Sequence, residues 1–399
     1  MLLRRFTSPG LAHYGYLVGA GDTAVAIDPR RDCADFAHAA ADAGMRITHI
    51  LETHRNEDMV SGSPELAAMT GAAVLHSAHD DLDYGFGEGV EHGEVLPLGG
   101  GLAMRAMHTP GHTEGHMSWV LLAPGAEPWA VFCGDCLFAG DVGRTDFYGP
   151  DRLGEMTGTL YDSIQAILAL GDGVLLYPAH GPGSACGSGI ADRPLTTVGL
   201  EKRLHPGLSL PREAFIERYS RTLPYPPYFR LMERLNLEGA TPLCRVADPA
   251  PLGPEDFAEA AEGADVLDVR DELAFASAHV PGALGIVHSS VGAFAGWFLD
   301  PEKPLCLVHD GPRGGDADPV AELRRMGFDD VRAVLSDGMT GWHMAGRPAR
   351  ASGVVSVQEL CGLLDEDSDL LVLDVRSPGE VAAQAIPGAT AIHVTELPG

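Results

Sequence analysis

Short apolar runs alternate with amphipathic stretches along residues 1–180, which is the pattern of a layered α/β domain. Strands are predicted at residues 16–18, 24–29, 47–51, 104–107, 119–122, 129–132 and 174–177. Helices are predicted at residues 36–43, 64–70 and 159–170. The second helix is defined by Ser63 as N-cap, Pro64 in the first turn and Gly71 at its end. The predicted fold is therefore mixed α/β.

The pattern changes after residue 200 and again near residue 250. Residues 200–245 are helical in pattern but interrupted by prolines, as in Leu-Pro-Tyr-Pro-Pro-Tyr at 223–228, which indicates a helical extension. The run Asp-Pro-Ala-Pro-Leu-Gly-Pro at 248–254 is typical of a linker. Residues 1–245 are therefore predicted to form the first domain.

An internal repeat follows the linker. Val-Leu-Asp-Val-Arg stands at 266–270 and again at 372–376, and Pro-Gly-Ala at 281–283 and again, at the same offset, at 387–389. A shift of this length marks a duplicated domain and not a short solenoid unit. A domain is therefore predicted at 251–350, followed by part of a second copy at 351–399.

Composition and charge limit the number of domains and the kinds of partner that the chain can have. The chain has 399 residues, 45% hydrophobic and 21% charged, which suits two or three globular domains. Its net charge of −29 at pH 7 argues against nucleic acid or an anionic membrane surface as the main partner. No run of 18 apolar residues is present, and Ser8, Pro9 and Gly10 interrupt the N-terminal segment before a secretory core forms. With seven thinly spread cysteines, expected to be reduced, we expect a cytoplasmic protein.

Four residues of metal-binding type share a position just beyond the C-terminal end of a predicted strand. They are His54, His112, Asp135 and His180. Loops at the strand ends of an α/β sheet meet around ligands, and imidazole and carboxylate groups bind metals. A single buried histidine is usually structural, but four such residues on turns marked by glycine or proline predict one metal site. His116 and Asp28 are expected to be structural hydrogen-bonding groups.

These residues lie in segments that resemble the metallo-β-lactamase superfamily. The segments are Thr-His-Arg-Asn-Glu-Asp-Met at 53–59, Thr-Pro-Gly-His-Thr-Glu-Gly-His at 109–116, Gly-Asp at 134–135 and Pro-Ala-His at 178–180. The resemblance implies an αββα sandwich. The first segment departs from the family's H-x-H-x-D-H pattern, because Asn56 and Met59 stand where two metal ligands are expected. His54, His112 and Asp135 remain.

Two neutral imidazoles and one carboxylate with open positions form the facial triad of mononuclear non-haem Fe(II) oxygenases. The stretch Gly-Arg-Thr-Asp-Phe at 143–147 resembles the persulfide dioxygenase branch of the superfamily, of which a subgroup is fused to rhodanese modules. The resemblance implies one catalytic Fe(II) per chain, bound by His54, His112 and Asp135. The implied reaction is oxidation of a low-molecular-weight thiol persulfide by O2 to sulfite and thiol.

Other residues in these motifs carry both a structural and a functional interpretation. Asp58 and His180 match ligands of the superfamily's second metal, and with Tyr177 we expect them to orient ligands or hold water. A weak second metal stays open as the alternative. Arg144 could bind a substrate carboxylate or phosphate through its bidentate fork, or it could pair with Asp146.

The repeated sequences after the linker resemble the α/β rhodanese domain, with residues 331–342 closing the first copy. Active rhodaneses place a nucleophilic cysteine at the start of a loop of backbone amides that holds an anion. In the matching loop at 307–315, Asp310 stands at that position, and Cys306 lies in the preceding predicted strand. The second copy ends before such a loop. Both modules are therefore expected to be catalytically silent docking or dimer surfaces, in a homo-oligomer.

Three functions follow from these observations. The leading one is persulfide dioxygenation with iron, whose partners are a small-molecule thiol persulfide and O2, without nucleic acid or membrane. The second is thioester hydrolysis like that of glyoxalase II, with zinc as the alternative cofactor, although Asn56 and Met59 weaken a two-metal centre. The third is a non-catalytic sulfur-relay scaffold, which the silent rhodanese loop favours and the intact triad opposes.

Overall fold

The computed structural model of the chain describes residues 1–187, 189–311, 318–366 and 370–397. These residues form two compact units. The first consists of the described residues of 1–246 together with residues 318–329, and the second of the described residues of 247–313 and 330–399. The first unit is therefore discontinuous in sequence.

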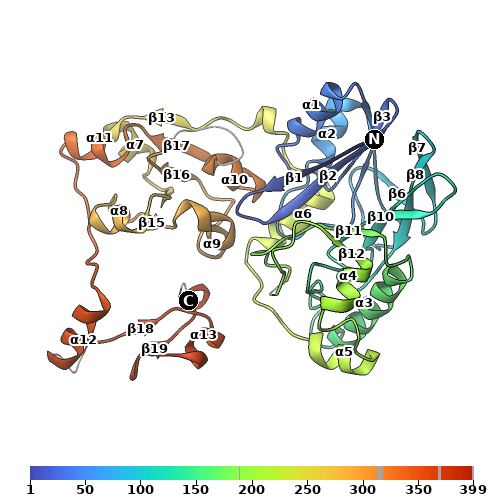
Figure 1. Ribbon diagram of the computed structural model, residues 1–399. Helices are drawn as coiled ribbons and strands as arrows, with labels where there is room; N and C mark the ends of the chain where they lie inside the picture. The colour runs from blue at the N-terminus through green and yellow to red at the C-terminus, as the bar shows by residue number, and fades with distance from the viewer. Residues whose placement is uncertain (188, 312–317, 367–369, 398–399) are drawn as a thin grey trace. The chain divides into compact units, whose positions relative to one another are not determined.

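Two six-stranded sheets form the centre of the first unit (Figure 1). The first sheet follows the chain order of its strands: β1 (Leu2–Ser8), β2 (His13–Ala20), β3 (Thr23–Ile27), β4 (Arg46–Leu51), β5 (Ala73–Ser77) and β6 (Glu88–Val90). The second has the order β12-β11-β10-β9-β8-β7, from β7 (Val95–Gly99), β8 (Leu102–His108), β9 (Met117–Leu122), β10 (Pro128–Gly134), β11 (Leu175–Pro178) and β12 (Thr196–Thr197).

Three hydrophobic clusters arrange this unit in four layers. One cluster lies between the two sheets and includes Tyr16 and Trp119. Because strand side chains alternate between faces, Leu17 points to the other side of the first sheet and packs with Phe36 of a covering helix. The outer face of the second sheet packs in the same way against Ile164. The covering helices are α1 (Ala34–Asp42) and α2 (Ser63–Thr70) on the first sheet and α3 (Leu153–Leu168), α4 (Val198–Leu204) and α5 (Arg212–Tyr219) on the second. This αββα order confirms the predicted fold class.

The starts of α2 and α3 differ from the predicted starts. α2 begins at Ser63, so its N-cap is Gly62 and not Ser63, whose side chain makes no capping hydrogen bond. Gly71 ends this helix in the left-handed conformation with φ 73°, as predicted. α3 begins at Leu153, before the predicted start at residue 159. A further helix, α6 (Phe229–Glu238), lies in the predicted helical extension.

The second unit contains a five-stranded parallel sheet in the order β13-β17-β16-β14-β15. Its strands are β13 (Ala250–Leu252), β14 (Asp265–Asp268), β15 (Leu284–Gly285), β16 (Leu305–Val308) and β17 (Val331–Leu335). The α-helices described between residues 250 and 350 are α7 (Pro254–Ala260), α8 (Glu272–Ser277), α9 (Val291–Phe298) and α11 (Gly338–Met344), with α10 (Pro319–Arg325) assigned to the first unit. Short 3-10 helices are η1 (Leu243–Arg245), η2 (His288–Ser290) and η3 (Val394–Glu396).

The internal repeat has a structural counterpart. Later elements of the chain are α12 (Val357–Glu366), β18 (Leu373–Asp374), α13 (Pro378–Ala383) and β19 (Thr390–Ala391). β18 pairs with β19 in the same parallel register as β14 with β15. Arg270 donates to both carboxylate oxygens of Asp268, and Arg376 donates likewise to Asp374. The repeated sequence therefore adopts the same strand, helix and strand in both copies.

None of the helices in the described part of the chain combines the length and apolar character that crossing a bilayer requires.

Candidate metal centre

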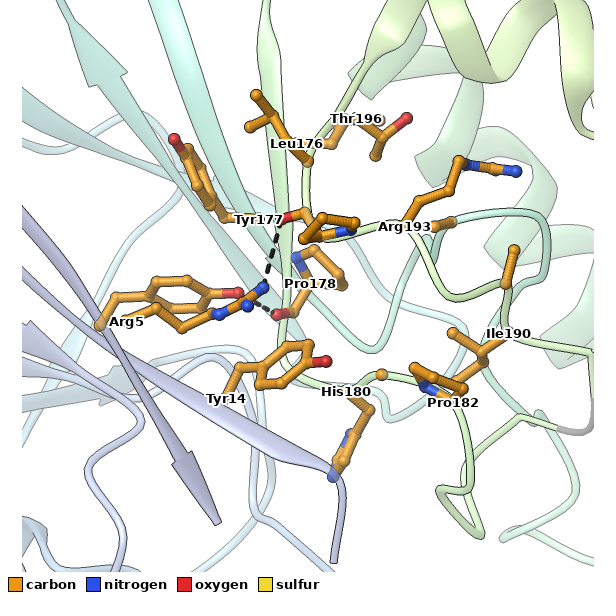
Figure 2. A pocket seen from close by; sticks show the side chains of 16 residues that line it. Arg5, Tyr14, Leu176, Tyr177, Pro178, His180, Pro182, Ile190, Arg193 and Thr196 are labelled. Atoms are coloured by element: carbon orange, nitrogen blue, oxygen red, sulfur yellow. Dashed lines mark hydrogen bonds between the residues drawn. The ribbon is translucent and has the colours of Figure 1, made fainter. Parts of the chain in front are cut away.

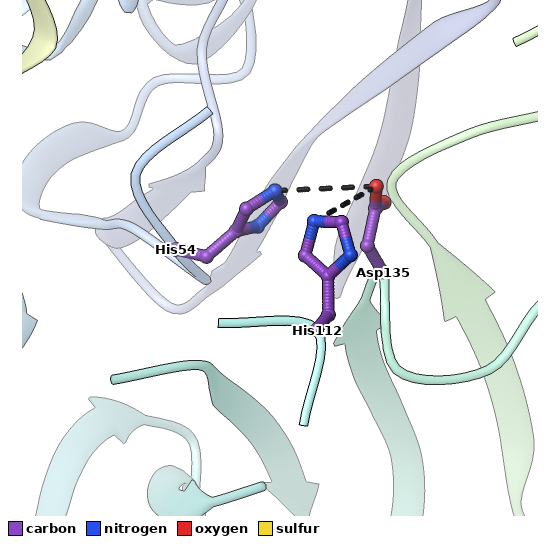
Figure 3. A group of neighbouring side chains, drawn as sticks. All are labelled: His54, His112 and Asp135. Carbon is purple, nitrogen blue, oxygen red and sulfur yellow. Dashed lines mark ion pairs between the residues drawn. The ribbon is translucent and has the colours of Figure 1, made fainter. Parts of the chain in front are cut away.

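Three predicted ligands come together at strand ends in the first unit. His54 follows β4, His112 follows β8 and Asp135 follows β10 directly. His54 Nε2 lies 4.0 Å and His112 Nε2 3.6 Å from the same atom, Asp135 Oδ2 (Figure 3). The three ligand atoms lie within 4.8 Å of one another, and all three side chains are buried.

The donor atoms of this triad are left without protein partners. His112 Nε2 and Asp135 Oδ2 are buried and have no hydrogen bond with any described residue. Burying such atoms unpaired is unfavourable unless another species satisfies them. Two imidazole nitrogens and a carboxylate oxygen suit a divalent transition metal, so the triad could hold a metal ion.

The hydrogen bonds on the Nδ1 side of His54 leave its Nε2 free for a metal. The backbone N–H and the hydroxyl of Thr53 both donate to Asp28, at 2.7 and 2.8 Å. With its proton engaged, the Thr53 oxygen is an acceptor for His54 Nδ1–H at 2.9 Å. Burial lowers the pKa of His54 well below its usual value, so the ring is neutral and the lone pair is on Nε2.

His112 is oriented by the loop that carries it and by the stretch at 143–147. Its Nδ1–H donates to the carbonyl oxygen of Arg144 at 2.9 Å, which again leaves Nε2 free. Gly111 precedes it with φ 138°, and a Cβ there would lie 2.4 Å from Leu160 Cα in α3. Only glycine allows this close approach, which sets the direction of His112.

Asp135 is held by two further histidines. Its Oδ1 accepts from His180 Nδ1 at 2.7 Å, and its backbone N–H donates to His116 Nε2 at 3.0 Å. Burial alone would raise the pKa of Asp135, but His180, His112 and His54 together hold that pKa well below its usual range. Burial lowers the pKa of His116 to about 3, so His116 remains a neutral acceptor. His116 is therefore structural, as expected.

Asp58 and His180 form a hydrogen-bonded pair beside the triad. His180 Nε2 lies 2.9 Å from Asp58 Oδ2, so both of its ring nitrogens face carboxylates. Although burial alone would lower it, Asp135 and Asp58 raise the pKa of His180 well above its usual value. The Cys186 thiol completes a second buried group with these two residues. We interpret this group as one that orients Asp135, because an imidazolium between two carboxylates has no free ligand atom.

Tyr177 and Arg144 are held by contacts of their own. Tyr177 stacks on Phe132 and lines a pocket with Tyr14 and His180 (Figure 2). The buried guanidinium of Arg144 donates to both Asp146 oxygens, at 2.7 and 2.9 Å. It also donates to the carbonyl oxygens of residues 223 and 224. These contacts favour the structural alternative for Arg144 over substrate binding.

The two residues that stand in place of superfamily ligands are both buried. Asn56 is buried, with Nδ2 3.5 Å from the His54 carbonyl oxygen, and Met59 is fully buried. Asn236 of α6 donates to the carbonyl oxygens of both Asn56 and Met59, at 2.6 and 2.7 Å. Tyr228, just before α6, donates to the Asp58 carbonyl oxygen at 2.9 Å. The role of α6 in holding this loop has no signal in the sequence.

Glu57 is a buried residue of the first motif that lies close to the triad and that the sequence prediction did not include. Its side chain is fully buried, with Oε2 3.7 Å from His112 Nε2 and 4.0 Å from His54 Nε2. Burial raises the pKa of Glu57. The available signal was a charged residue placed between two predicted site residues of one motif.

The rhodanese-like loop is described only in part. Cys306 lies buried in β16, and burial raises the pKa of its thiol to about 11. Asp310 follows the strand, and a Cβ on Gly338 would lie 2.5 Å from its Oδ1. Residues 312–315 of the predicted anion loop lie outside the described residues. The absence of sulfurtransferase activity in this module therefore stays a prediction.

Comparisons with known proteins agree with both units. Residues 253–345 match the family model of the rhodanese-like domain. The mitochondrial persulfide dioxygenase ETHE1 of Mus musculus is 30% identical over 226 residues, which cover 54% of this chain and 80% of that protein. The crystal structure of a metallo-beta-lactamase from Staphylococcus aureus superposes with a TM-score of 0.73 at 27% identity, covering 84% of this chain and 98% of that one.

A second group of relatives is named for a different activity. The hydroxyacylglutathione hydrolase of Nitrosococcus oceani is 33% identical over 181 residues, which cover 44% of this chain and 64% of that protein. The chain thus spans less than two thirds of the length of this hydrolase, and the same holds for three further hydrolases of that name.

Proposed function

Because the chain belongs to the metallo-β-lactamase superfamily and carries a rhodanese domain, we propose that it is a mononuclear non-haem iron persulfide dioxygenase. Its substrates are O2 and the persulfide of a low-molecular-weight thiol. The balanced reaction consumes one persulfide, one O2 and one water, and it releases one thiol, one sulfite and two protons. The sulfane sulfur is oxidised and O2 is reduced.

The donor set carries this proposal. Two Nε2 lone pairs and one carboxylate oxygen converge, while Asn56 and Met59 stand in place of two histidines. Such a set leaves open positions for O2 and a substrate, as in mononuclear Fe(II) oxygenases. The 80% coverage of a relative named as a persulfide dioxygenase supports the same reaction.

The residues around the triad orient its three side chains and fix the positions of their protons. Iron, when bound, would supply the redox chemistry with O2. Thr53 and the Arg144 carbonyl oxygen keep the Nδ1 protons on His54 and His112, so that both Nε2 atoms face one point. His180 fixes Asp135 through Oδ1 and leaves Oδ2 for the metal. The burial of all three ligands limits the access of water to the centre.

Thioester hydrolysis with zinc is the second candidate. The 33% identity to a hydroxyacylglutathione hydrolase favours it. Such hydrolysis needs a metal-bound hydroxide and commonly uses two metals. With Asn56 and Met59 in the first motif and both His180 nitrogens facing carboxylates, the chain offers few ligands for a second metal. We therefore rank hydrolysis below dioxygenation.

The two functions separate in one experiment on the full-length chain. The metal-free protein is loaded with Fe(II) or with Zn(II), and each form is assayed for O2 uptake with glutathione and coenzyme A persulfides and for cleavage of a glutathione thioester. We expect O2 uptake and sulfite from the iron form only. Thioester cleavage by the zinc form, without O2 uptake by the iron form, would establish the hydrolase instead. Inactivity of both forms in both assays would favour the sulfur-relay scaffold.

A further inference from the structure

Arg55 lies between the triad and the surface of the first unit. Its Nη2 is 3.5 Å from Glu57 Oε1, and the Glu57 side chain is fully buried beside His112. The same Nη2 is 3.4 Å from Glu233 Oε1, on a side chain that is 29% exposed. The Arg55 side chain is itself 16% exposed. When the reacting sulfur of a substrate reaches the triad, the rest of that substrate therefore has to pass close to this guanidinium group.

Two aromatic side chains connect Arg55 to the triad by a second route. The ring of Phe147 meets the His112 ring edge-on, with centroids 5.1 Å apart, and Tyr225 packs against Phe147 at 6.2 Å. The Tyr225 hydroxyl donates at 2.7 Å to Glu233 Oε1, the oxygen that also faces Arg55. Phe147 is half-buried and Tyr225 is 36% exposed. Three separate segments of the chain thus bring a guanidinium group and two partly exposed rings together beside His112.

The hydrogen-bond donors of Arg55 are incompletely satisfied. Both carboxylates approach the same nitrogen, Nη2, at distances longer than the usual range of about 2.7–3.2 Å. The Nε atom is buried without a hydrogen-bond partner among the described residues. By contrast, Arg144 donates from Nε and Nη2 to Asp146 at 2.7 and 2.9 Å. A buried N–H group without an acceptor is unfavourable, and a guanidinium group matches a carboxylate in shape and charge. Arg55 therefore lacks an acceptor that an anionic ligand could supply.

We propose that Arg55 binds a carboxylate of the thiol that carries the sulfane sulfur, with Phe147 and Tyr225 packing against this carrier. The inference rests on the proposed function and names its substrate class, which is persulfides of thiols that bear a carboxylate. In a chain with a net charge of −29, an anionic carrier needs a local cation of this kind. Glu233 competes with the carrier for Arg55 and so limits its affinity.

Anaerobic binding to the full-length, iron-loaded protein tests this inference without turnover. Two thiols of similar shape are titrated by calorimetry, 3-mercaptopropionate with its carboxylate and 3-mercaptopropionamide with a neutral amide. We expect the parent protein to bind the carboxylate at least about tenfold more tightly, as a hydrogen bond between charged groups allows. Arg55→Gln should abolish this preference. The matched control is Arg152→Gln, which removes a guanidinium group already paired with Glu114 and Glu155 and should retain it.

Two results would overturn the inference directly. One is the absence of a preference in the parent protein, which includes binding of neither thiol. The other is a full preference in Arg55→Gln. If that variant fails to fold, Glu233→Gln supplies a test of opposite sign. It removes the competing carboxylate, so the affinity for 3-mercaptopropionate should rise about two- to fivefold while that for the amide stays the same. An unchanged or lower affinity for 3-mercaptopropionate would overturn the inference.

The inference and the proposed function can fail separately. O2 uptake on a persulfide by a protein that shows no preference for the carboxylate leaves the dioxygenase and removes the role of Arg55. A preference that depends on Arg55, in a protein without O2 uptake on any persulfide, leaves the carboxylate site and removes the proposed reaction.

Discussion

Thr53 shows how a single residue can orient a proposed metal ligand. Its hydroxyl donates to Asp28 and therefore accepts from His54 Nδ1–H, which places the free lone pair on Nε2. A partner of this kind fixes both the tautomer and the orientation of a ligating histidine.

Replacing Thr53 by valine should therefore weaken metal binding. Thr53→Val keeps the shape of the side chain and removes the hydroxyl, so that His54 Nδ1–H loses its acceptor. We expect an affinity loss of about 10- to 100-fold. Titration of the metal-free protein with Fe(II) or Co(II) measures it, with Thr53→Ser as the control that retains the hydroxyl. Equal affinities for the valine and serine variants would contradict the role of this hydrogen bond.

The sequence predicts the triad but not the residues that support it. His54, His112 and Asp135 could be identified because metal-binding side chains follow strand ends there. The position of Glu57 depends on a loop that Asn236 holds from 180 residues later in the chain. Local pattern carries no information about such a contact, so Glu57 could be identified as charged but not as buried beside His54 and His112.

At the scale of elements, the backbone of the stretch at 143–147 supports the proposed metal centre. A Cβ on Gly143 would lie 1.9 Å from the carbonyl oxygen of Asp135 and 3.2 Å from His112 Nδ1. The next residue, Arg144, accepts from that His112 nitrogen, and its guanidinium is fixed by Asp146. This explains why glycine and arginine stand side by side without either one binding the metal.

Gly143→Ala should disrupt this support. The added methyl group forces the stretch away from Asp135, which should lower the free energy of unfolding by about 1–3 kcal/mol, as overpacking typically does, and reduce metal occupancy. Gly154→Ala in the first turn of α3 is the control, because nothing lies within 4 Å of its Cβ. Thermal unfolding and metal analysis compare the two variants. If both variants match the parent protein, the close approach is not required.

The end of α4 should make the stability of the first unit sensitive to acid. His205 caps this helix, accepts from the N–H of Gly207 at 3.0 Å, and has its pKa lowered by burial. A histidine with a depressed pKa stabilises the fold above its unfolded value of about 6.5, and this contribution is lost as the pH falls below it. The loss is at most about 1.4 kcal/mol per pH unit.

Chemical denaturation between pH 7 and pH 5 tests this contribution. The fall in unfolding free energy should be smaller for His205→Gln than for the parent protein. His38→Gln on the exposed face of α1 should leave it unchanged. If His205→Gln keeps the pH dependence of the parent protein, His205 does not contribute to the loss of stability in acid.

Elements differ in how far the sequence predicts them. The predicted part of β9, residues 119–122, is a continuous apolar run because both of its faces are covered. By contrast, β6 has three residues, two of them exposed, and lacks any such pattern. The start of α2 was misplaced by one residue because Ser63 resembles a capping residue, although its side chain caps nothing.

At the scale of the molecule, residues from the region matched to the rhodanese-like domain complete the first unit. Arg31 is buried and donates to Asp329 and to the carbonyl oxygen of Arg324. Arg325 of α10 donates to Asp32, and its carbonyl oxygen accepts from Val60 N–H at 2.8 Å. The loop that carries the metal ligands and α10 are therefore directly hydrogen-bonded.

Truncation should therefore affect the metal centre even though the linker marks a change in composition. A chain ending at residue 246 leaves the buried Arg31 without Asp329, which should lower the unfolding free energy by about 1–3 kcal/mol. It should also lose metal affinity, because Val60 loses its acceptor near Asp58. A chain ending at residue 350 retains α10 and should keep both properties. Equal stability and metal content in the two chains would contradict this coupling.

The sequence predicted that the first domain ends near residue 250. It did not predict that residues 318–329 belong to the first unit as well. The Pro-rich linker and the composition on either side of it indicate this domain boundary. The place of residues 318–329 in the first unit depends on contacts such as that between Arg325 and Asp32, which are 293 residues apart. No local sequence pattern encodes such a contact.

The central claim is that this metal centre oxygenates a persulfide. The most direct measurement is the ratio of sulfite formed to O2 consumed by the full-length, iron-loaded protein acting on glutathione persulfide. We predict one sulfite per O2, with no turnover by the zinc-loaded protein or by Asp135→Asn. Absence of O2 uptake by protein that carries one iron per chain, across both glutathione and coenzyme A persulfides, would contradict the claim.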